Sequence, residues 1–163
     1  MNLLALIASH NNSITDNGIK NMNLHTLDAS NNIHITDRGI NHMSNLKVLA
    51  ASGESRITDE GIKNLNLIAL DATSNCNITD TSIKQLNLEK LYACYNPKIT
   101  DEGIKHLKLN TLYASGHTCQ ISDRSIKHLK LHTIKADYNK NITGQDTKKF
   151  KLINRGYCIK ITD

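Results

Sequence analysis

The residues best suited to chemistry are six aspartates that recur at nearly equal spacing along the chain: Asp16, Asp37, Asp59, Asp80, Asp101 and Asp123. Aligned carboxylates could bind a metal ion or serve as catalytic acids and bases. Each one, however, follows a Thr or Ser and precedes a helical pattern. Thr or Ser at that position caps the first helical N–H groups, and Asp in the first turn interacts favourably with the helix dipole. This repetition favours a structural role, so we predict neither a metal site nor a catalytic site there.

Histidine and cysteine side chains give weaker candidates. His106 and His128 share a column of neighbouring repeats but lack a third ligand at regular spacing. Cys76 and Cys119 share another column two repeats apart, a separation of about 10 Å that is too long for a disulfide. Cys94 is expected at a surface turn, where no neighbouring pair of residues completes a catalytic triad. The sequence therefore predicts a protein that is not an enzyme, with no cofactor and no metal.

Composition excludes several classes of protein. The 163 residues contain no run of the ~20 apolar residues that a membrane helix needs. The apolar stretch near residues 3–8 has no basic flank before it and is a poor secretion signal. The four cysteines form no Cys-x-x-Cys pair and are too sparse for a disulfide scaffold, which indicates a reducing, intracellular and cytoplasmic setting. The net charge of +5 permits an acidic partner without requiring nucleic acid.

One tripeptide marks a repeating unit along the whole chain. Ile-Thr-Asp, or a close variant of it, begins at Ile14, Ile35, Ile57, Ile78, Ile99, Ile121, Ile142 and Ile161, in steps of 19 to 22 residues. A fixed period in this range is typical of a solenoid. The aligned copies give the unit L-x-x-L-x-A-x-x-N-x-x-I-T-D-x-G-I-K-x-L.

Each unit predicts one short strand and one short helix. The L-x-x-L-x-A segment ends in the period-two alternation of a half-buried strand, and such strands are expected near residues 3–8, 24–29, 46–51, 67–72, 88–93, 109–114 and 131–136. The segment after Ile-Thr-Asp buries an Ile and then a Leu or Met three residues later, as in Ile62 and Leu65. That spacing predicts a helix of about two turns.

Two further columns of the alignment have expected structural roles. One column of the alignment holds Asn in five of the repeats: Asn11, Asn32, Asn75, Asn96 and Asn139. In this column the third repeat has Glu54 and the sixth has His117 or Thr118. An amide can both donate to and accept from backbone groups, so we predict a ladder of Asn side chains; the alternative is that Asn merely forms turns. A second column holds only Gly or Ser, from Gly18 to Ser125, and is expected to let adjacent helices approach closely.

Leu24, Leu27, Ala29 and Asn32 match the L-x-x-L-x-L-x-x-N segment of the leucine-rich repeat, with Ala in place of the third Leu. The I-T-D-x-G-I-K-x-L half resembles the cysteine-containing subtype that accompanies F-box domains, and the shorter period is similar to internalin-type repeats. The resemblance covers about residues 3–150, although the Asn column has no Cys and the sequence contains no F-box. The Asn-, Ile- and Lys-rich repeats look like those of amoebae, giant viruses or other AT-rich genomes, and a viral protein of this kind would lie in the host cytoplasm.

The resemblance implies an α/β fold. It is a right-handed solenoid in a horseshoe arc, with a parallel β-sheet on the concave face and short helices on the convex face. Residues 1–163 would form a single domain of about seven repeats, and residues 142–163 a degenerate repeat or C-terminal cap that includes Phe150 and Tyr157.

Function is expected on the concave face, where side chains differ from repeat to repeat. Two positions of each repeat are expected to point outward on this face. They hold four of the five tyrosines and three charged residues: Tyr92, Tyr95, Tyr113, Tyr138, Asp28, Asp71 and Lys135. Tyrosine is enriched at protein interfaces because it buries a large area and keeps a hydroxyl group. We therefore predict a scaffold that binds another protein there; the alternative for the tyrosines is that they only stack to protect the sheet.

Two other functions remain open. The first strand is expected to lack a cap, so its edge could pair with another chain, giving a structural protein that assembles end to end, or a longer protein could supply the missing repeat. A row of lysines on the convex side could attract nucleic acid, although the aspartates run beside it and offset its charge: Lys20, Lys63, Lys84, Lys105 and Lys127.

Overall fold

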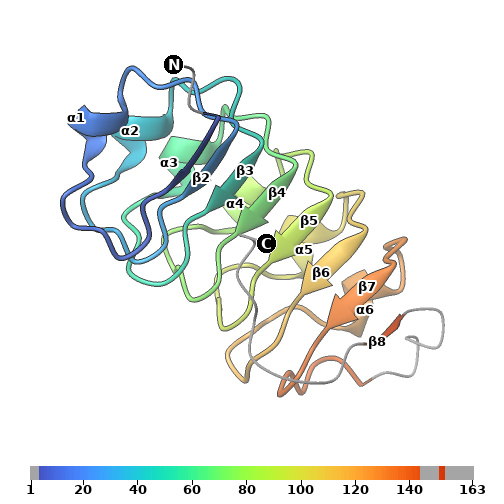
Figure 1. Cartoon of the computed structure of the whole chain (residues 1–163). Coiled ribbons are helices and arrows are strands. Elements are labelled where there is room, and N and C mark those ends of the chain that lie inside the picture. Colours follow the sequence, from blue (N-terminus) through green and yellow to red (C-terminus); the bar gives the residue numbers. More distant parts are fainter. Residues whose placement is uncertain (1–3, 144–150, 153–163) are drawn as a thin grey trace.

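The protein is built from successive coils that each contain one strand and one short helix. The computed structural model describes residues 4–143 and 151–152. Eight strands form one parallel sheet in which every strand lies beside its neighbour in sequence, and the short helices lie on the other side of the array (Figure 1). This arrangement confirms the predicted α/β repeat fold.

The strands and helices alternate along the chain, and coil 1 to coil 8 are named after their strands. The strands are β1 (Ala5–Ile7), β2 (Thr26–Asp28), β3 (Val48–Ala50), β4 (Ala69–Asp71), β5 (Lys90–Tyr92), β6 (Thr111–Tyr113), β7 (Thr133–Lys135) and β8 (Lys151–Leu152). The helices are α1 (Asp16–Ile19), α2 (Asp37–Ile40), α3 (Asp59–Ile62), α4 (Asp80–Ile83), α5 (Asp101–Ile104) and α6 (Asp123–Ile126). Within the described residues no helix is long and apolar enough to cross a membrane.

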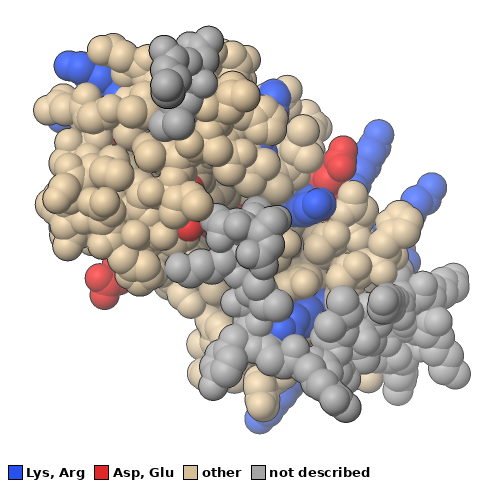
Figure 2. All heavy atoms as spheres, viewed as in Figure 1, with Lys and Arg blue, Asp and Glu red and all other residues tan. Residues whose placement is uncertain are grey.

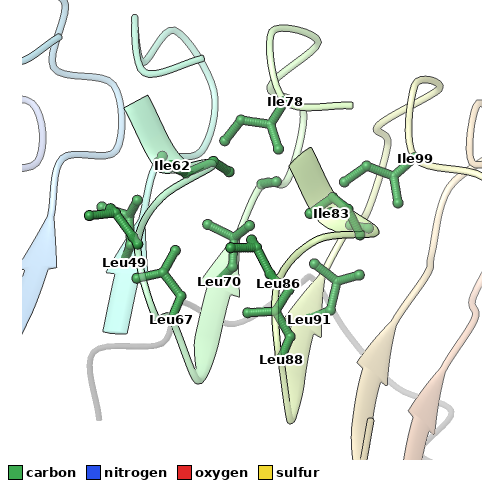
Figure 3. Close-up of a cluster of buried hydrophobic side chains, with 14 of the residues drawn as sticks. Leu49, Ile62, Leu67, Leu70, Ile78, Ile83, Leu86, Leu88, Leu91 and Ile99 are labelled. Carbon is green, nitrogen blue, oxygen red and sulfur yellow. The ribbon is translucent and has the colours of Figure 1, made fainter. Parts of the chain in front are cut away.

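The hydrophobic core lies between the sheet and the helices. The central Leu of each strand is in register with that of the next, so Leu49, Leu70 and Leu91 form one buried row. Ile62 and Ile83 approach this row from the helices (Figure 3). Burial of such a Leu or Ile side chain stabilises the fold by roughly 1.5–3 kcal/mol, and the stacked aliphatic layers explain why few aromatic residues are needed.

The elements are shorter than predicted. Each strand through β7 has three residues, against the six expected, and each helix has four, against about two turns. Each of these strands begins two residues later and ends one residue earlier than predicted, and its end precedes a turn in which the second residue after the buried Ala has a positive φ. The helices end early because the next turn tightens, as where the Leu65 N–H donates to the Ile62 carbonyl. The predicted cap over residues 142–163 lies almost entirely outside the described residues.

Thr and Ser cap the helices as predicted. In coils 2 to 6 the hydroxyl oxygen of the residue before the helix accepts the N–H of the residue two positions later. These capping residues are Thr36, Thr58, Thr79, Thr100 and Ser122. Thr15 in coil 1 makes no such bond.

The asparagines form the predicted ladder between coils. The Asn96 side-chain amide donates to three carbonyl groups of coil 4 at 2.7–3.2 Å, and its oxygen accepts the Lys98 N–H at 2.8 Å. Asn32, Asn75 and Asn139 make equivalent bonds. The ladder therefore satisfies backbone groups that the turn leaves without secondary-structure partners.

Coils 3 and 6 replace the Asn with a different inward residue. Glu54 is exposed, and Ser55 is buried in its place. In coil 6 the buried residue is Cys119 rather than the expected His117 or Thr118, so one coil does carry a cysteine in the inward position. Burial raises the pKa of the Cys119 thiol.

A second ladder links each aspartate to the next coil. Thr58 donates its N–H to Asp37 Oδ1 at 2.8 Å and its hydroxyl to Oδ2 at 2.7 Å. The Gly column makes room for these carboxylates, because a Cβ on Gly61 would collide with Asp37 Oδ1. Where Ser takes this place, as in Ser82, its hydroxyl donates to the carboxylate instead. The small residues thus accommodate Asp, which is a more specific role than the close helix approach that we predicted.

Candidate protein-binding surface

The outward side chains of the strands form one row across the sheet, which we call the strand-face row: Ile7, Asp28, Ala50, Asp71, Tyr92, Tyr113 and Lys135. Parallel pairing in register places each member beside the next. Tyr92 and Tyr113 are direct neighbours with ring centroids 4.6 Å apart and planes tilted by 55°. The two rings therefore form a continuous aromatic surface over coils 5 and 6.

Charged residues flank the two tyrosines. The Lys135 ammonium group lies 5.7 Å from the centroid of the Tyr113 ring, within the range of a cation–π interaction. At the other side, Asp71 is in register with Tyr92. Burial raises the pKa of Tyr92, and the neighbouring Tyr113 and Asp71 raise it further. The Tyr92 hydroxyl therefore keeps its proton to a higher pH than an ordinary tyrosine does.

The charged members of the strand-face row are almost fully buried. Asp28 accepts the Ser30 N–H at 2.9 Å, and Asp71 accepts the Thr73 N–H at 2.9 Å, so both carboxylates support the turn after their strand. Lys135 is also buried. Asp71 and Lys135 therefore flank the tyrosine pair, whereas Asp28 lies in β2, three strands away from Tyr92.

Two further tyrosines, Tyr95 and Tyr138, lie in a separate row at the turn after each strand. We call it the turn row: His10, Asn31, Gly53, Ser74, Tyr95, Gly116 and Tyr138. All seven have a positive φ, between 54° and 105°. Gly and Asn adopt this conformation readily, whereas other residues adopt it at a cost of about 1–2 kcal/mol. The sequence alone did not reveal this turn geometry.

Tyr95 and Tyr138 project from the turn row, with 40% and 80% of their surface exposed. The Tyr95 ring lies over Gly116, where any Cβ would collide with it. His117 meets the same ring edge-on, with centroids 6.0 Å apart. His117 was not among the predicted site residues, because it was assigned to the Asn column.

Cys94 differs from the expectation of an exposed, reduced thiol. Cys94 is fully buried and disulfide-bonded, so it is not an exposed residue of the tyrosine surface. Cys76 and Cys119 are free thiols, the first exposed and the second buried, although they share one column of the repeat. Among residues 4–143 and 151–152, no group of three or more His, Cys, Asp or Glu residues could hold a metal ion.

A shallow hollow lies at the other end of the turn row. It has a volume of about 400 Å³ and is lined by His10, Asn12, Asn31, Ile33 and Glu54. The Asn31 side-chain oxygen accepts the Glu54 N–H at 3.1 Å, so this polar group of the hollow is already bound to the backbone of the next coil. This hollow was not predicted from the sequence.

The convex lysines are exposed, as expected for solvated positions: Lys20, Lys63, Lys84, Lys105 and Lys127. Lys63 pairs with Glu60, and Lys105 pairs with Glu102, which lowers the pKa of Glu102. On the face shown in Figure 2, Lys and Arg are scattered over the part that is not grey.

Comparison with known proteins identifies the fold. No protein family and no curated protein matches the sequence. A chain in the crystal structure of the Rad7 and Elc1 complex of yeast is similar, with a TM-score of 0.65 and 20% sequence identity over 87% of this chain. The match covers 44% of that chain, so this chain corresponds to less than half of it. The likeness, together with the parallel sheet and the repeat period, identifies an α/β repeat fold of the leucine-rich-repeat type.

Proposed function

We propose that the protein is a non-enzymatic scaffold that binds a partner protein through the tyrosines of coils 5 to 7. The partner surface consists of Tyr92 and Tyr113 on the strand-face row and Tyr95 and Tyr138 on the turn row. Asp71 and Lys135 flank the surface, and Asp28 would extend it towards coil 2. The fold is consistent with a protein-binding scaffold, and the matched yeast structure is itself a complex of two proteins.

The observation that carries this proposal is the exposure of Tyr95 and Tyr138 at strained turn positions. Protection of the sheet accounts for Tyr92 and Tyr113, whose rings contact each other at a tilt of 55°. It does not account for Tyr138, a residue that is 80% exposed. A tyrosine at a positive φ costs stability that Gly would not cost, and retention of strain is characteristic of functional positions.

The test is a quantitative pull-down with the full chain as bait, followed by direct binding of the captured protein. Tyr138→Ala and Tyr95→Ala should each weaken binding at least about tenfold, as expected for aromatic hot-spot residues. Lys84→Ala on the convex side is the matched control and should bind like the wild type. Thermal unfolding should show that all three variants are folded.

The result that would overturn the proposal is equal binding of a protein by the wild type and by both tyrosine variants. Loss of binding by Lys84→Ala alone would instead assign the contact to the convex lysines, where nucleic acid was the third candidate.

A further inference from the structure

Charge is divided unequally between the two halves of the solenoid. Residues 4–82 contain five Lys or Arg and eight Asp or Glu, whereas residues 83–143 contain ten Lys or Arg and five Asp or Glu. The net charge is −3 over the first segment and +5 over the second. The described cations are therefore concentrated in the second half of the array.

One column of the repeat shows where this change occurs. We call it the linker column, the exposed residue directly before the first Leu of each coil from coil 2 to coil 7: Asn23, Asn45, Asn66, Asn87, Lys108 and Lys130. Neighbouring members lie within reach of each other, because the Asn45 amide donates to the Asn23 oxygen at 2.9 Å. The backbone beside Lys108 and Lys130 is joined between coils in the same way. These two lysines therefore place like charges side by side where earlier coils have neutral amides.

No ion pair within residues 4–143 neutralises these two lysines. Glu89 lines a hollow together with Lys108, but its carboxylate lies 3.5 Å from the side-chain amide of Asn110. Glu102 pairs with Lys105. The first-turn aspartates of α5 and α6 accept hydrogen bonds from the following coil. The positive charges of the linker column are therefore available to a partner.

Other exposed cations adjoin the two lysines. Arg124 and Lys127 are three residues apart across α6, which places them on one side of that helix. We call the whole set the cationic patch: Lys108, Arg124, Lys127, Lys130, His106, His128 and His132. The patch contains no Tyr, Phe or Trp, and no exposed large hydrophobic side chain of the described residues belongs to it. A partner of this patch must therefore be bound through charge and hydrogen bonds.

The lysine row on the convex side is a weaker candidate for such a contact. It extends from Lys20 into the half whose net charge is negative. Two of its members pair with glutamates of their own coils, Lys63 with Glu60 and Lys105 with Glu102. Only one residue of the row, in coil 6, also belongs to the cationic patch.

The chemistry of the patch selects among the possible polyanions. A protein hot spot or a membrane-inserting surface needs apolar anchors, and single-stranded nucleic acid needs aromatic side chains on which its bases stack. The phosphate backbone of a duplex needs neither, because Lys and Arg bind it by releasing its counterions. We infer that the cationic patch binds the phosphate backbone of a nucleic-acid duplex without reading its sequence. This contact uses none of the four surface tyrosines and does not rest on the proposed partner binding.

The test measures binding of a short fluorescent DNA duplex of mixed sequence to the full chain by anisotropy, as the salt concentration is raised. Four phosphate contacts, from Lys108, Arg124, Lys127 and Lys130, give a slope of about −3.6 for the logarithm of affinity against the logarithm of salt concentration. The affinity should therefore fall roughly 150-fold between about 50 and 200 mM salt.

Substitutions within the linker column identify the surface that is used. Lys108→Asn and Lys130→Asn restore the amide that four other coils carry there, so the fold should tolerate them. Each should weaken binding about five- to tenfold at about 0.1 M salt and make the slope about 0.9 less steep. Asn87→Lys, beside Lys108 in the same column, should strengthen binding and steepen the slope by a similar amount. Lys20→Asn removes the same charge from coil 1 and is the matched control, which should bind like the wild type.

Three results overturn the inference. The first is a wild type that does not bind the duplex at about 50 mM salt. The second is binding that Lys108→Asn and Lys130→Asn leave unchanged while circular dichroism shows both variants folded, because another surface is then used. The third is tighter binding to anionic lipid vesicles, to polyglutamate or to the single DNA strand than to the duplex, which assigns the patch to that other class of partner.

Discussion

Thr36 donates both its backbone N–H and its hydroxyl to the carboxylate of Asp16 in the preceding coil, at 2.7 and 2.6 Å. The aspartates looked in sequence like residues that only complement a helix dipole. They in fact join consecutive coils through charge-assisted bonds, which are stronger than bonds between neutral groups.

Loss of one such carboxylate should destabilise the protein. Asp37→Asn keeps the shape of the side chain but presents an N–H group to a position where Asp accepts from Thr58. We expect the free energy of unfolding to fall by about 1.5–3 kcal/mol, measured by urea denaturation. Glu60→Gln in the next coil is the control and should change stability by less than about 0.5 kcal/mol, because its ion pair with Lys63 is exposed. Equal effects of the two variants would show that the ladder adds nothing.

The Asn ladder gives a second contrast, between an interior coil and coil 1. Asn96→Ala removes the donor to three carbonyl groups and leaves them buried without that partner, so it should cost roughly 2–4 kcal/mol. Asn11→Ala removes an exposed side chain that bonds only to its own turn, and should cost less than about 1 kcal/mol. Thermal or urea unfolding measures both. A similar loss in the two variants would mean that Asn acts only as a turn former.

The sequence was sufficient to predict the rows that repetition specifies. The central leucines, the Asn ladder and the Thr caps occur at fixed spacing, and each residue type suits one physical role. The register of Tyr92 beside Tyr113 followed from the same spacing. Repetition therefore predicted the fold and the position of the aromatic pair.

What could not be predicted depends on local competition between neighbouring residues. Cys76 and Cys119 both lie two residues before an Ile of the repeat, yet only Cys119 is buried. Asn75 precedes Cys76 and takes the inward place, whereas coil 6 has no Asn to do so. Likewise the positive φ at Tyr138 is imposed by the geometry of the repeat, against the preference of the residue itself.

That conflict at Tyr138 predicts a gain in stability on substitution. Tyr138→Gly relieves the left-handed backbone strain and removes a ring that is mostly exposed, so we expect stabilisation of about 0.5–1 kcal/mol. The same variant should lose partner binding if Tyr138 contacts the partner. Gly116→Ala is the opposite case and should destabilise by about 1–2 kcal/mol, because its Cβ would strike the Tyr95 ring. Differential scanning calorimetry compares the two; destabilisation by Tyr138→Gly would contradict the strain argument.

The raised pKa of Tyr92 predicts a loss of stability in alkaline solution. Folded Tyr92 keeps its proton to a higher pH than the unfolded chain does, so this contribution is complete below about pH 10 and is lost as the pH rises through the folded pKa. Urea unfolding between pH 8 and about pH 11.5 should show this decline, and Tyr92→Phe should reduce it. Tyr138→Phe, at an exposed ring, is the control. An unchanged decline in Tyr92→Phe would assign the effect to other groups.

The Asp and Thr ladder also bears on how such a protein can change length during evolution. Each interior coil carries the carboxylate for its successor and the donors for its predecessor, as coil 3 does through Asp59 and Thr58. An in-frame duplication or deletion of one such unit therefore leaves no orphaned group at either new boundary. The number of surface side chains available for recognition can grow or shrink by whole units, without any compensating mutation in the framework.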